Sequence, residues 1–365
     1  MISVKEICSC IEEFAPLSWQ ESWDNCGLLV GNPQQSVNRA LVTVDVNEAV
    51  VAEAVDVQAQ IILCHHPLML SGIKRLTGSD DAQRAIALAI KNDIAIYAAH
   101  TNMDSAPGGI SHRMADKLGL TGRQVLSPQS TVLQKLVTFI PVSHFERVRQ
   151  TIFDAGAGHT GNYDLCGYSV EGSGTFRALE AATPFVGVHG KMYAEPEMRF
   201  ETIFPTHLKQ QIVTALLNSH PYEEPVFDIY ALQNTDMRVG LGLVGMLPAP
   251  VGEMDFLNML KKIFSPPVVR HTILKGRNIQ KVALCGGSGS SLLPNAIRNK
   301  ADAYVAADFK YHQFAEVKHD ILVADVGHYE SEHFAKEIFH ELLMKKFPNF
   351  AVSFSKIITN PINYL

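Results

Sequence analysis

The stretch ALVTVDVNEAVVAEAVDVQAQIILCHH (residues 40–66) contains two apolar runs with an amphipathic run between them. The apolar runs have the length of buried strands, and the run between them has the spacing of a helix. Asn47 is a favourable capping residue at the start of that helix, and Glu48 lies in its first turn. Near-continuous apolar strands that alternate with helices are typical of parallel sheets covered on both faces, so this stretch predicts an α/β fold.

The alternation continues through both outer parts of the chain. Residues 79–93 predict a helix that opens with Ser79, and residues 94–100 (IAIYAAH) predict another strand. The last third of the chain repeats the same rhythm. We therefore expect a two-lobed α/β core with mainly parallel sheets, formed by residues 1–128 and 237–365.

The middle of the chain, residues 129–236, has a different pattern. FIPVSHFERVRQTI (residues 139–152) and IFPTHLKQQIVTAL (residues 203–216) share one plan, in which a strand and a proline precede a helix capped by Ser143 or Thr206. Two such halves predict an inserted ferredoxin-like α+β domain.

Composition and charge disfavour several classes of protein. The chain has 365 residues, 47% of them hydrophobic and 19% charged, which predicts compact structure in more than one domain. No apolar run approaches the roughly 20 residues that span a bilayer. The start MISVKEICSC lacks a signal-peptide core, so we expect a cytoplasmic protein with no membrane partner. The net charge of −6, without a lysine or arginine run, disfavours nucleic acid as a partner.

Four predicted strands of the outer parts end in polar residues. The endings are LCHHP (residues 63–67), YAAHTNMD (residues 97–104), VAADFKYH (residues 305–312) and VADVGHYESE (residues 323–332). In open α/β sheets, ligands gather at the carboxyl ends of the strands. We therefore expect these imidazoles and carboxylates to form one cluster.

The doublet His65–His66 is the first candidate in this cluster. Neighbouring strand residues point to opposite faces, so the two imidazoles suit two metal ions better than one. Solvent-facing or merely hydrogen-bonded imidazoles are the alternative. His328 and Glu332 are four residues apart, which on a helix places both on one face, where they can share a metal. Here the alternative is an ordinary helix start, a role that Glu330 also suits.

Several other residues near these endings are open to more than one interpretation. Either His100 or Asp104 could ligate a metal, and the residues themselves do not choose between them. Asp308 and His312 could orient the ligands or move protons. On an alternating strand Cys64 faces away from His65, so we expect a core thiol there.

The glycine-rich LCGGSGSS (residues 284–291) could bind a phosphate through free amides, but it lacks the GK[ST] ending of a P-loop. The mixture of imidazoles and carboxylates favours zinc, iron or manganese over calcium. Two such ions about 4 Å apart can activate a water molecule near neutral pH.

Eight motifs occur in an order that matches a known family. They are SWDNCGLLVG, VTVDVNEAVVAEA, ILCHHPLML, YAAHTNMDSAPGGI, GLGLVG, LCGGSGSSL, DFKYHQF and DVGHYESE. With them the chain resembles the GTP cyclohydrolase I type 2 homologues, or Nif-three-like dinuclear metal-centre hexameric proteins, in the long form with a PII- or CutA-like insertion. The resemblance implies a toroidal homohexamer and two divalent metal ions. It places His65 on one metal and His66 on the other, adds Asp104 rather than His100, and supplies His328 with Glu332 as the bridging carboxylate.

The resemblance also implies a reaction, the hydrolytic opening of the guanine imidazole ring of GTP with loss of formate. We therefore expect a dinuclear metal-dependent hydrolase for a nucleotide or related heterocycle, with His100 or His312 as proton shuttle. The alternative is a metal-binding regulatory, sensing or adaptor protein without catalysis, in which the inserted domain binds an effector. A DNA-encircling ring is a third option, disfavoured by the lack of a basic stripe.

Overall fold

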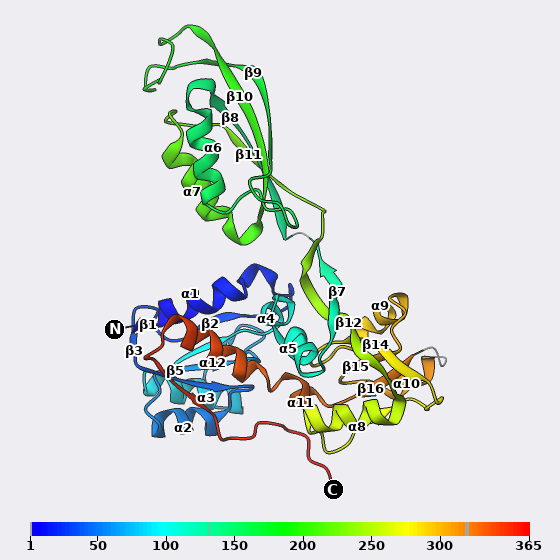
Figure 1. The fold of residues 1–365 in the computed structure, drawn as a ribbon. Helices are drawn as coiled ribbons and strands as arrows, with labels where there is room; N and C mark the ends of the chain where they lie inside the picture. Colours follow the sequence, from blue (N-terminus) through cyan, green and yellow to red (C-terminus); the bar gives the residue numbers. More distant parts are fainter. Residues whose placement is uncertain (1, 131, 318–320) are drawn as a thin grey trace. The chain divides into compact units, whose positions relative to one another are not determined.

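The computed structural model describes residues 2–130, 132–317 and 321–365 (Figure 1). The chain divides into two compact units. The outer unit comprises residues 1–129 and 237–365, and the middle unit comprises residues 130–236. No helix in the described part of the chain is both long and apolar enough to cross a membrane.

The first large sheet of the outer unit has the strand order β17-β4-β5-β6-β2. Its strands are β17 (Ala351–Phe354), β4 (Arg39–Thr43), β5 (Ile61–Cys64), β6 (Ala95–Ala98) and β2 (Gly27–Val30). The first four are parallel, and β2 is antiparallel to β6. The prediction of parallel strands in residues 40–66 is therefore confirmed. β17, near the end of the chain, completes a sheet otherwise formed by its first hundred residues.

Helices cover both faces of this sheet. Leu41, Ile62 and Ile96 pack against α2 (Glu48–Asp56) and α3 (Asp81–Lys91) on one face. The alternate strand residues pack against α1 (Val4–Phe14) and α12 (Ala335–Lys346) on the other. Burial on both faces explains why the strands are apolar at nearly every position.

The second large sheet has the order β13-β16-β15-β14-β12-β7. Its strands are β13 (Arg270–His271), β16 (Leu322–Asp325), β15 (Ala303–Ala306), β14 (Asn278–Leu284), β12 (Asp236–Gly252) and β7 (Thr121–Gln129). β14, β15 and β16 run parallel, whereas β13 is antiparallel to β16 and β12 is antiparallel to β14. The expectation of mainly parallel sheets thus holds for the first sheet, while the second is mixed because strands from the junction with the middle segment join its edge.

The remaining elements of the outer unit are short, apart from one helix. They are β1 (Ile2–Ser3) paired with β3 (Ser36–Val37), and the helices α4 (Thr101–Ser105), α5 (Ile110–Lys117), α8 (Glu253–Phe264), α9 (Leu293–Arg298), α10 (Tyr311–Glu316) and α11 (His328–Glu332). Both α4 and α11 begin within four residues of a strand end, so they hold polar side chains at the carboxyl edges of the two sheets.

The middle unit has one antiparallel sheet with the order β11-β8-β10-β9. Along the chain its elements are β8 (Leu133–Pro141), α6 (Phe145–Asp154), β9 (Gly167–Arg177), β10 (Met192–Pro205), α7 (Lys209–Ser219) and β11 (Phe227–Ala231). Side chains of both helices share one buried cluster with Leu136 and Phe200, and Figure 1 shows the helices on the same face of the sheet.

The helix starts differ in part from those predicted. Asn47 caps α2 as expected, accepting a hydrogen bond from the Val50 amide at 2.9 Å. Asp80, rather than Ser79, caps α3. The predicted caps Ser143 and Thr206 are wrong, because each lies in a short 3-10 turn and α6 and α7 begin after those turns. In both places a proline precedes a 3-10 turn that leads directly into the α-helix. The residue at the start of the α-helix therefore lies after the predicted cap.

Candidate metal centre

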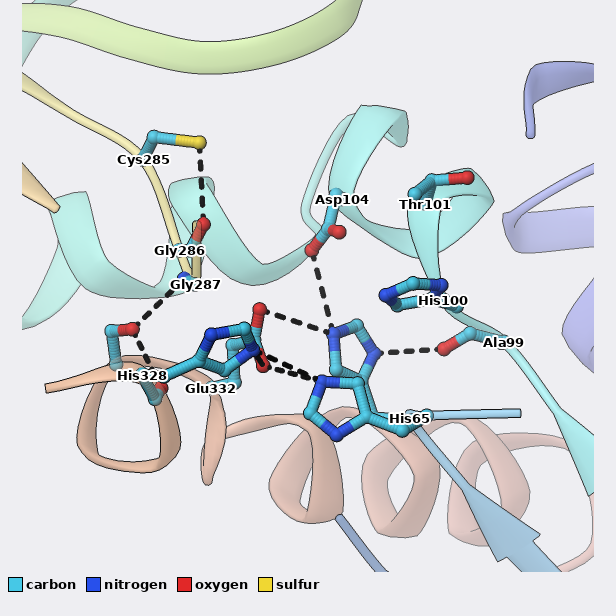
Figure 2. A network of polar contacts seen from close by, with 12 residues as sticks. His65, Ala99, His100, Thr101, Asp104, Cys285, Gly286, Gly287, His328 and Glu332 are labelled. Carbon is cyan, nitrogen blue, oxygen red and sulfur yellow. Dashed lines mark hydrogen bonds and ion pairs between the residues drawn. The ribbon is translucent and has the colours of Figure 1, made fainter. Parts of the chain in front are cut away.

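The predicted ligands come together in the outer unit, where the strand ends of the two sheets meet (Figure 2). His65 and His66 follow β5 directly, and both of their amides donate to the carbonyl of Val44, at 3.0 and 2.9 Å. Asp104 lies in α4, and α11 supplies two more side chains, His328 and Glu332. Figure 2 shows Asp104, His65 and Glu332 directed toward one another.

Glu332 lies at the centre of this cluster and is only 3% exposed. Its Oε2 is 2.8 Å from His66 Nε2 and 2.9 Å from His328 Nε2. Its Oε1 faces His65 Nε2 at 3.7 Å, and Asp104 Oδ1 lies 3.7 Å from the same nitrogen. The two oxygens of one carboxylate therefore face two different groups of ligand atoms.

Three groups in the described part of the chain have ligand atoms within 4.8 Å of one another. They are His66–His328–Glu332, His65–Asp104–Glu332 and His65–His66–His100. The first two separate the histidine doublet, and Glu332 belongs to both. The predicted reason for this separation, that neighbouring strand residues point to opposite faces, was wrong, however. β5 ends at Cys64, so the doublet lies beyond the strand, and its ring centroids are 5.0 Å apart rather than on opposite faces of the sheet.

Each imidazole of the cluster makes a hydrogen bond to an oxygen atom through its Nδ1. The pairs are His65 with the Ala99 carbonyl (2.8 Å), His66 with Asp45 (2.7 Å), His100 with Asp24 (2.9 Å) and His328 with Asp308 (2.7 Å). Carbonyl and carboxylate oxygens only accept, so each Nδ1 carries a proton and donates. In the neutral imidazole this leaves the lone pair on Nε2, as in histidines that ligate metals.

Three buried atoms of the cluster lack a hydrogen bond of good geometry, namely His65 Nε2, Asp104 Oδ1 and Glu332 Oε2, the last of which still lies close to two imidazole nitrogens. Leaving a buried polar atom without a hydrogen bond costs about 1–3 kcal/mol. Unpaired buried atoms of this kind are therefore typical of a site that binds a ligand. Burial also raises the pKa of Asp104. Glu332 is more deeply buried, but the surrounding His65, His328 and His66 hold its pKa well below the usual value. The donor set of imidazole nitrogens and carboxylate oxygens therefore fits a divalent transition metal.

His66 and His328 have pKa values far above the usual range for histidine. Burial alone would lower the pKa of His66, but hydrogen bonds to Asp45 and Glu332 raise it to about 10. Burial likewise opposes protonation of His328, whose pKa rises to about 11 beside Asp308 and Glu332. The carboxylates thus attract positive charge into the cluster, and a metal ion would have to displace these protons to bind.

The glycine-rich segment between β14 and α9 lies against the cluster. Gly287 has φ of +57°, and a Cβ atom there would be 1.9 Å from Glu332 Oε1 and 3.2 Å from His328 Nε2. Its amide, one of those that could have bound a phosphate, donates to Ser331 Oγ at 2.9 Å. The Gly289 amide donates within the segment to the Gly287 carbonyl. These two amides are therefore engaged, and the glycine makes room for the ligands.

Comparison with known proteins shows the family of the chain. The family model of Duf34/NIF3 (NGG1p interacting factor 3) matches residues 2–361. The chain belongs to the Duf34/NIF3 family. It is similar to the GTP cyclohydrolase 1 type 2 homolog of Halalkalibacterium halodurans, with 36% identity over 98% of each chain. The homolog of the same name from Bacillus subtilis is 34% identical, with 100% of this chain and 99% of the homolog covered.

A solved structure with the same architecture is that of a Bacillus cereus protein related to NIF3. It is 34% identical to this chain, the TM-score is 0.84, and the match covers 100% of this chain and 99% of that one. The outer and middle units of this Duf34/NIF3 chain therefore have their counterparts in a protein of the same family.

The other predicted site residues of this Duf34/NIF3 chain have different fates. His100 lies in the cluster, and Asp308 contacts His328 as proposed. His312 is exposed in α10, where its ring packs edge-on against Tyr311, and it belongs to none of the three groups found among the described residues. Cys64 is a buried core thiol whose Sγ lies 3.4 Å from the Tyr97 carbonyl. Neither His312 nor Cys64 is thus placed to ligate.

Three acidic residues have roles that the sequence analysis did not assign. Asp45 follows β4 at the same sheet edge as His65, so the rule that selected the histidines would also have selected it. Asp24 precedes β2, which is antiparallel, so the start of β2 lies beside the end of β6. Glu330, expected as an ordinary helix-start residue, is buried and accepts a hydrogen bond from Asn360 at 3.0 Å.

Proposed function

We propose that this chain is a dinuclear metal-dependent hydrolase that acts on a nucleotide or a related heterocycle. The observation that carries the proposal is the set of four imidazoles whose Nδ1 atoms are all held by oxygens, around the buried carboxylate Glu332. Such support from behind is what metal-ligating histidines require. A purely structural cluster would have no reason to leave His65 Nε2 and Asp104 Oδ1 unpaired.

The proposed ligands follow the grouping of the side chains. His65 and Asp104 would hold one ion, His66 and His328 the other, and Glu332 would bridge both. Zinc, iron and manganese suit this mixture of nitrogen and oxygen donors. When bound, a pair of such ions supplies Lewis acidity and lowers the pKa of water.

His100 is the proposed proton-transfer residue. Asp24 fixes the proton on His100 Nδ1, and Asp24 is itself held by the amides of Thr101 at 3.0 Å and Asn25 at 2.7 Å. Burial would raise the pKa of Asp24, but hydrogen bonds from His100 and the Thr101 hydroxyl hold it below its usual value, so Asp24 stays ionised. The His100 Nε2 atom, on the cluster side, is then free to accept or deliver a proton. We assign no part in the reaction to the exposed His312.

Opening of the guanine imidazole ring with loss of formate is the proposed reaction. It is supported by the name of the relatives, GTP cyclohydrolase 1 type 2 homolog, and by a cluster that, with two metal ions bound, would activate water. We further propose a toroidal homohexamer, on the strength of the family resemblance. A location in the cytoplasm is proposed because the start MISVKEICSC lacks a signal-peptide core.

The middle segment, residues 129–236, is proposed to be an inserted ferredoxin-like domain of the PII or CutA type, between core halves 1–128 and 237–365. Its β-α-β-β-α-β succession of elements and its antiparallel sheet support this assignment.

The test uses full-length protein loaded in turn with zinc, iron or manganese, with the metal content measured before assay. GTP and a panel of related nucleotides are then examined for turnover and released formate. We expect turnover with the native protein and none with His66→Ala, which should also lose one metal equivalent. His312→Ala is the matched control and should keep both metals and full activity.

Two outcomes would count against this proposal separately. Absence of turnover across the panel, with two metals bound, would leave the metal site but remove the hydrolase. Retention of two metals by His66→Ala would refute the ligand assignment. The first outcome would favour the alternative, a metal-binding sensing or adaptor protein, which is supported by a large pocket in the middle unit.

A further inference from the structure

The middle unit contains a pocket of about 880 Å³ that no part of the proposed reaction uses. Its walls are strands β9 and β10, the segment of residues 178–185 that follows β9, and residues 222–226. Four aromatic side chains line it, namely Phe139, Phe176, Phe185 and Tyr222. Its volume lies in the range of small-molecule sites, and its lining combines aromatic and other apolar side chains with several charged ones.

The polar group deepest in this lining is the carboxylate of Glu197, which is only 7% exposed. Its Oε1 accepts a hydrogen bond from the Tyr222 hydroxyl at 2.8 Å. Burial and the neighbouring Glu197 raise the pKa of Tyr222, so the hydroxyl keeps the proton that it donates. A Cβ atom at Gly174 would lie 2.0 Å from Glu197 Oε2, so only glycine lets the carboxylate rest against β9.

The charges around the pocket are predominantly negative. Four carboxylates line it, from Glu171, Glu197, Glu223 and Glu224, against two guanidinium groups, from Arg177 and Arg199. Arg199 forms an ion pair at 2.9 Å with Glu201, which is not a lining residue. No lysine contributes to the lining. An anionic ligand would therefore meet a repulsive pocket, and a cationic ligand an attractive one.

The aromatic walls contact one another and are held in place. The Tyr222 ring centroid lies 6.2 Å from those of Phe176 and Phe185, and the His144 ring packs edge-on against Phe185 at 5.2 Å. The segment that closes one side is tied down, because the Thr183 amide donates to Glu223 Oε1 at 2.8 Å. Faces of aromatic rings attract cations, most strongly where water is excluded.

We propose that this pocket binds a small organic cation, an alkylammonium or arylalkylammonium ion. Its charged nitrogen would lie against Glu197, and its apolar part among the aromatic rings. This combination of a buried carboxylate and ring faces selects a cation with an apolar body over a metal ion, which would need several oxygen or nitrogen ligands. The proposal goes beyond the metal-dependent reaction and does not depend on it.

The test measures binding to the full-length, metal-depleted protein by titration calorimetry. The probes are 2-phenylethylammonium and choline, each compared with a neutral alcohol of the same shape, 2-phenylethanol and 3,3-dimethylbutanol. We expect each cation to bind at least about tenfold more tightly than its neutral counterpart, since a charge-assisted contact is formed only by the cation.

Two variants locate the site. Glu197→Gln keeps the shape and the acceptor for Tyr222, and should abolish the preference for the cation. Phe176→Leu keeps an apolar wall without a ring face, and should weaken cation binding several-fold. Glu146→Gln is the control, because Glu146 lies on the exposed side of α6 outside the pocket, and should bind like the native protein. Thermal unfolding of each variant establishes that it is folded.

Three results would overturn the proposal. Equal affinity for the cation and the alcohol would show that the pocket does not distinguish a charged ligand from a neutral one. An unchanged preference in folded Glu197→Gln and an unchanged affinity in Phe176→Leu would place the binding elsewhere. Absence of binding by either cation at millimolar concentration would show that the pocket is closed or covered in the native protein, for example by a second copy of the chain.

Discussion

The support of each imidazole by an oxygen atom is the main property of the site at the scale of single residues. Asp45 faces His66 Nδ1 and is not itself in any group of potential ligands within the described chain. Its carboxylate fixes the tautomer and the orientation of the ring and raises its basicity as a ligand. The affinity of the site for metal should therefore depend on residues that do not touch the metal.

Asp45→Asn tests this dependence. The amide can occupy the same space, but it lacks the charge that favours the proton on Nδ1. We expect metal affinity to fall by about 10–100-fold, as is typical when such support is lost. Competition with a chromogenic chelator measures it. Asp56→Asn, on the exposed side of α2, is the control and should leave the affinity unchanged. Equal affinity in both variants would contradict the role given to Asp45.

Turns between elements determine how closely the ligand-bearing segments approach one another. The segment after β14 passes so near α11 that residue 287 has no room for a Cβ atom. The segment after β17 returns to the same region, where Thr359 Oγ1 donates to Asp45 Oδ2 at 2.6 Å. Both contacts lie between parts of the chain that are distant in sequence.

Gly287→Ala should damage the metal site as well as the fold. The left-handed backbone alone costs an alanine about 1–2 kcal/mol. The added Cβ atom would also displace Glu332, so metal binding should be lost or strongly reduced. Gly276→Ala is a matched control, since Gly276 has φ of +70° and open space around it. We expect a similar drop in stability there with normal metal content, as measured by denaturant unfolding and metal analysis.

Thr359→Val should weaken metal binding through Asp45. The variant keeps the shape of threonine but cannot donate to the carboxylate, which then becomes less well oriented toward His66. We expect a several-fold loss of metal affinity, smaller than that of Asp45→Asn. Thr359→Ser retains the hydroxyl and should restore native affinity. If valine and serine behave alike, the C-terminal segment does not influence the cluster.

The electrostatics of the cluster affect the stability of the whole molecule. In the metal-free protein the folded-state pKa values of His66 and His328 are raised to about 10 and 11, above an unfolded value near 6.5. Protonation of these histidines stabilises the folded state, and the whole of this free energy is present below pH 6.5. It is lost as the pH rises toward 10. A bound metal replaces these protons and binds more tightly at higher pH.

The gain in Tm on metal loading should therefore increase with pH. Metal binding to the folded state alone contributes about 2.7 kcal/mol at a hundredfold excess over Kd. We expect a larger Tm difference between loaded and metal-free protein at pH 9 than at pH 7, measured by calorimetry in the same buffers. A difference that stays constant or shrinks would show that protons and metal do not compete for these imidazoles.

The local sequence pattern was sufficient to predict many of the strands, helices and site residues of this protein. The apolar runs and the capping Asn47 predicted the strand–helix–strand unit, and the spacing of His328 and Glu332 predicted a shared helix face. These features depend on residues a few positions apart, whose periodicity is visible in the chain. The positions of the strand ends likewise pointed to His65 and His66.

The tertiary structure alone decided the rest. β17 pairs with β4 across more than three hundred residues, and the start of antiparallel β2 brings Asp24 to His100. The segment with Gly287 lies against Glu332 and His328, a contact that its glycine-rich composition did not indicate. Strand direction, sheet order and the approach of distant segments result from long-range packing, and no local periodicity records them. The sequence therefore determined which imidazoles and carboxylates are candidate ligands, and the fold determined which oxygen supports each imidazole.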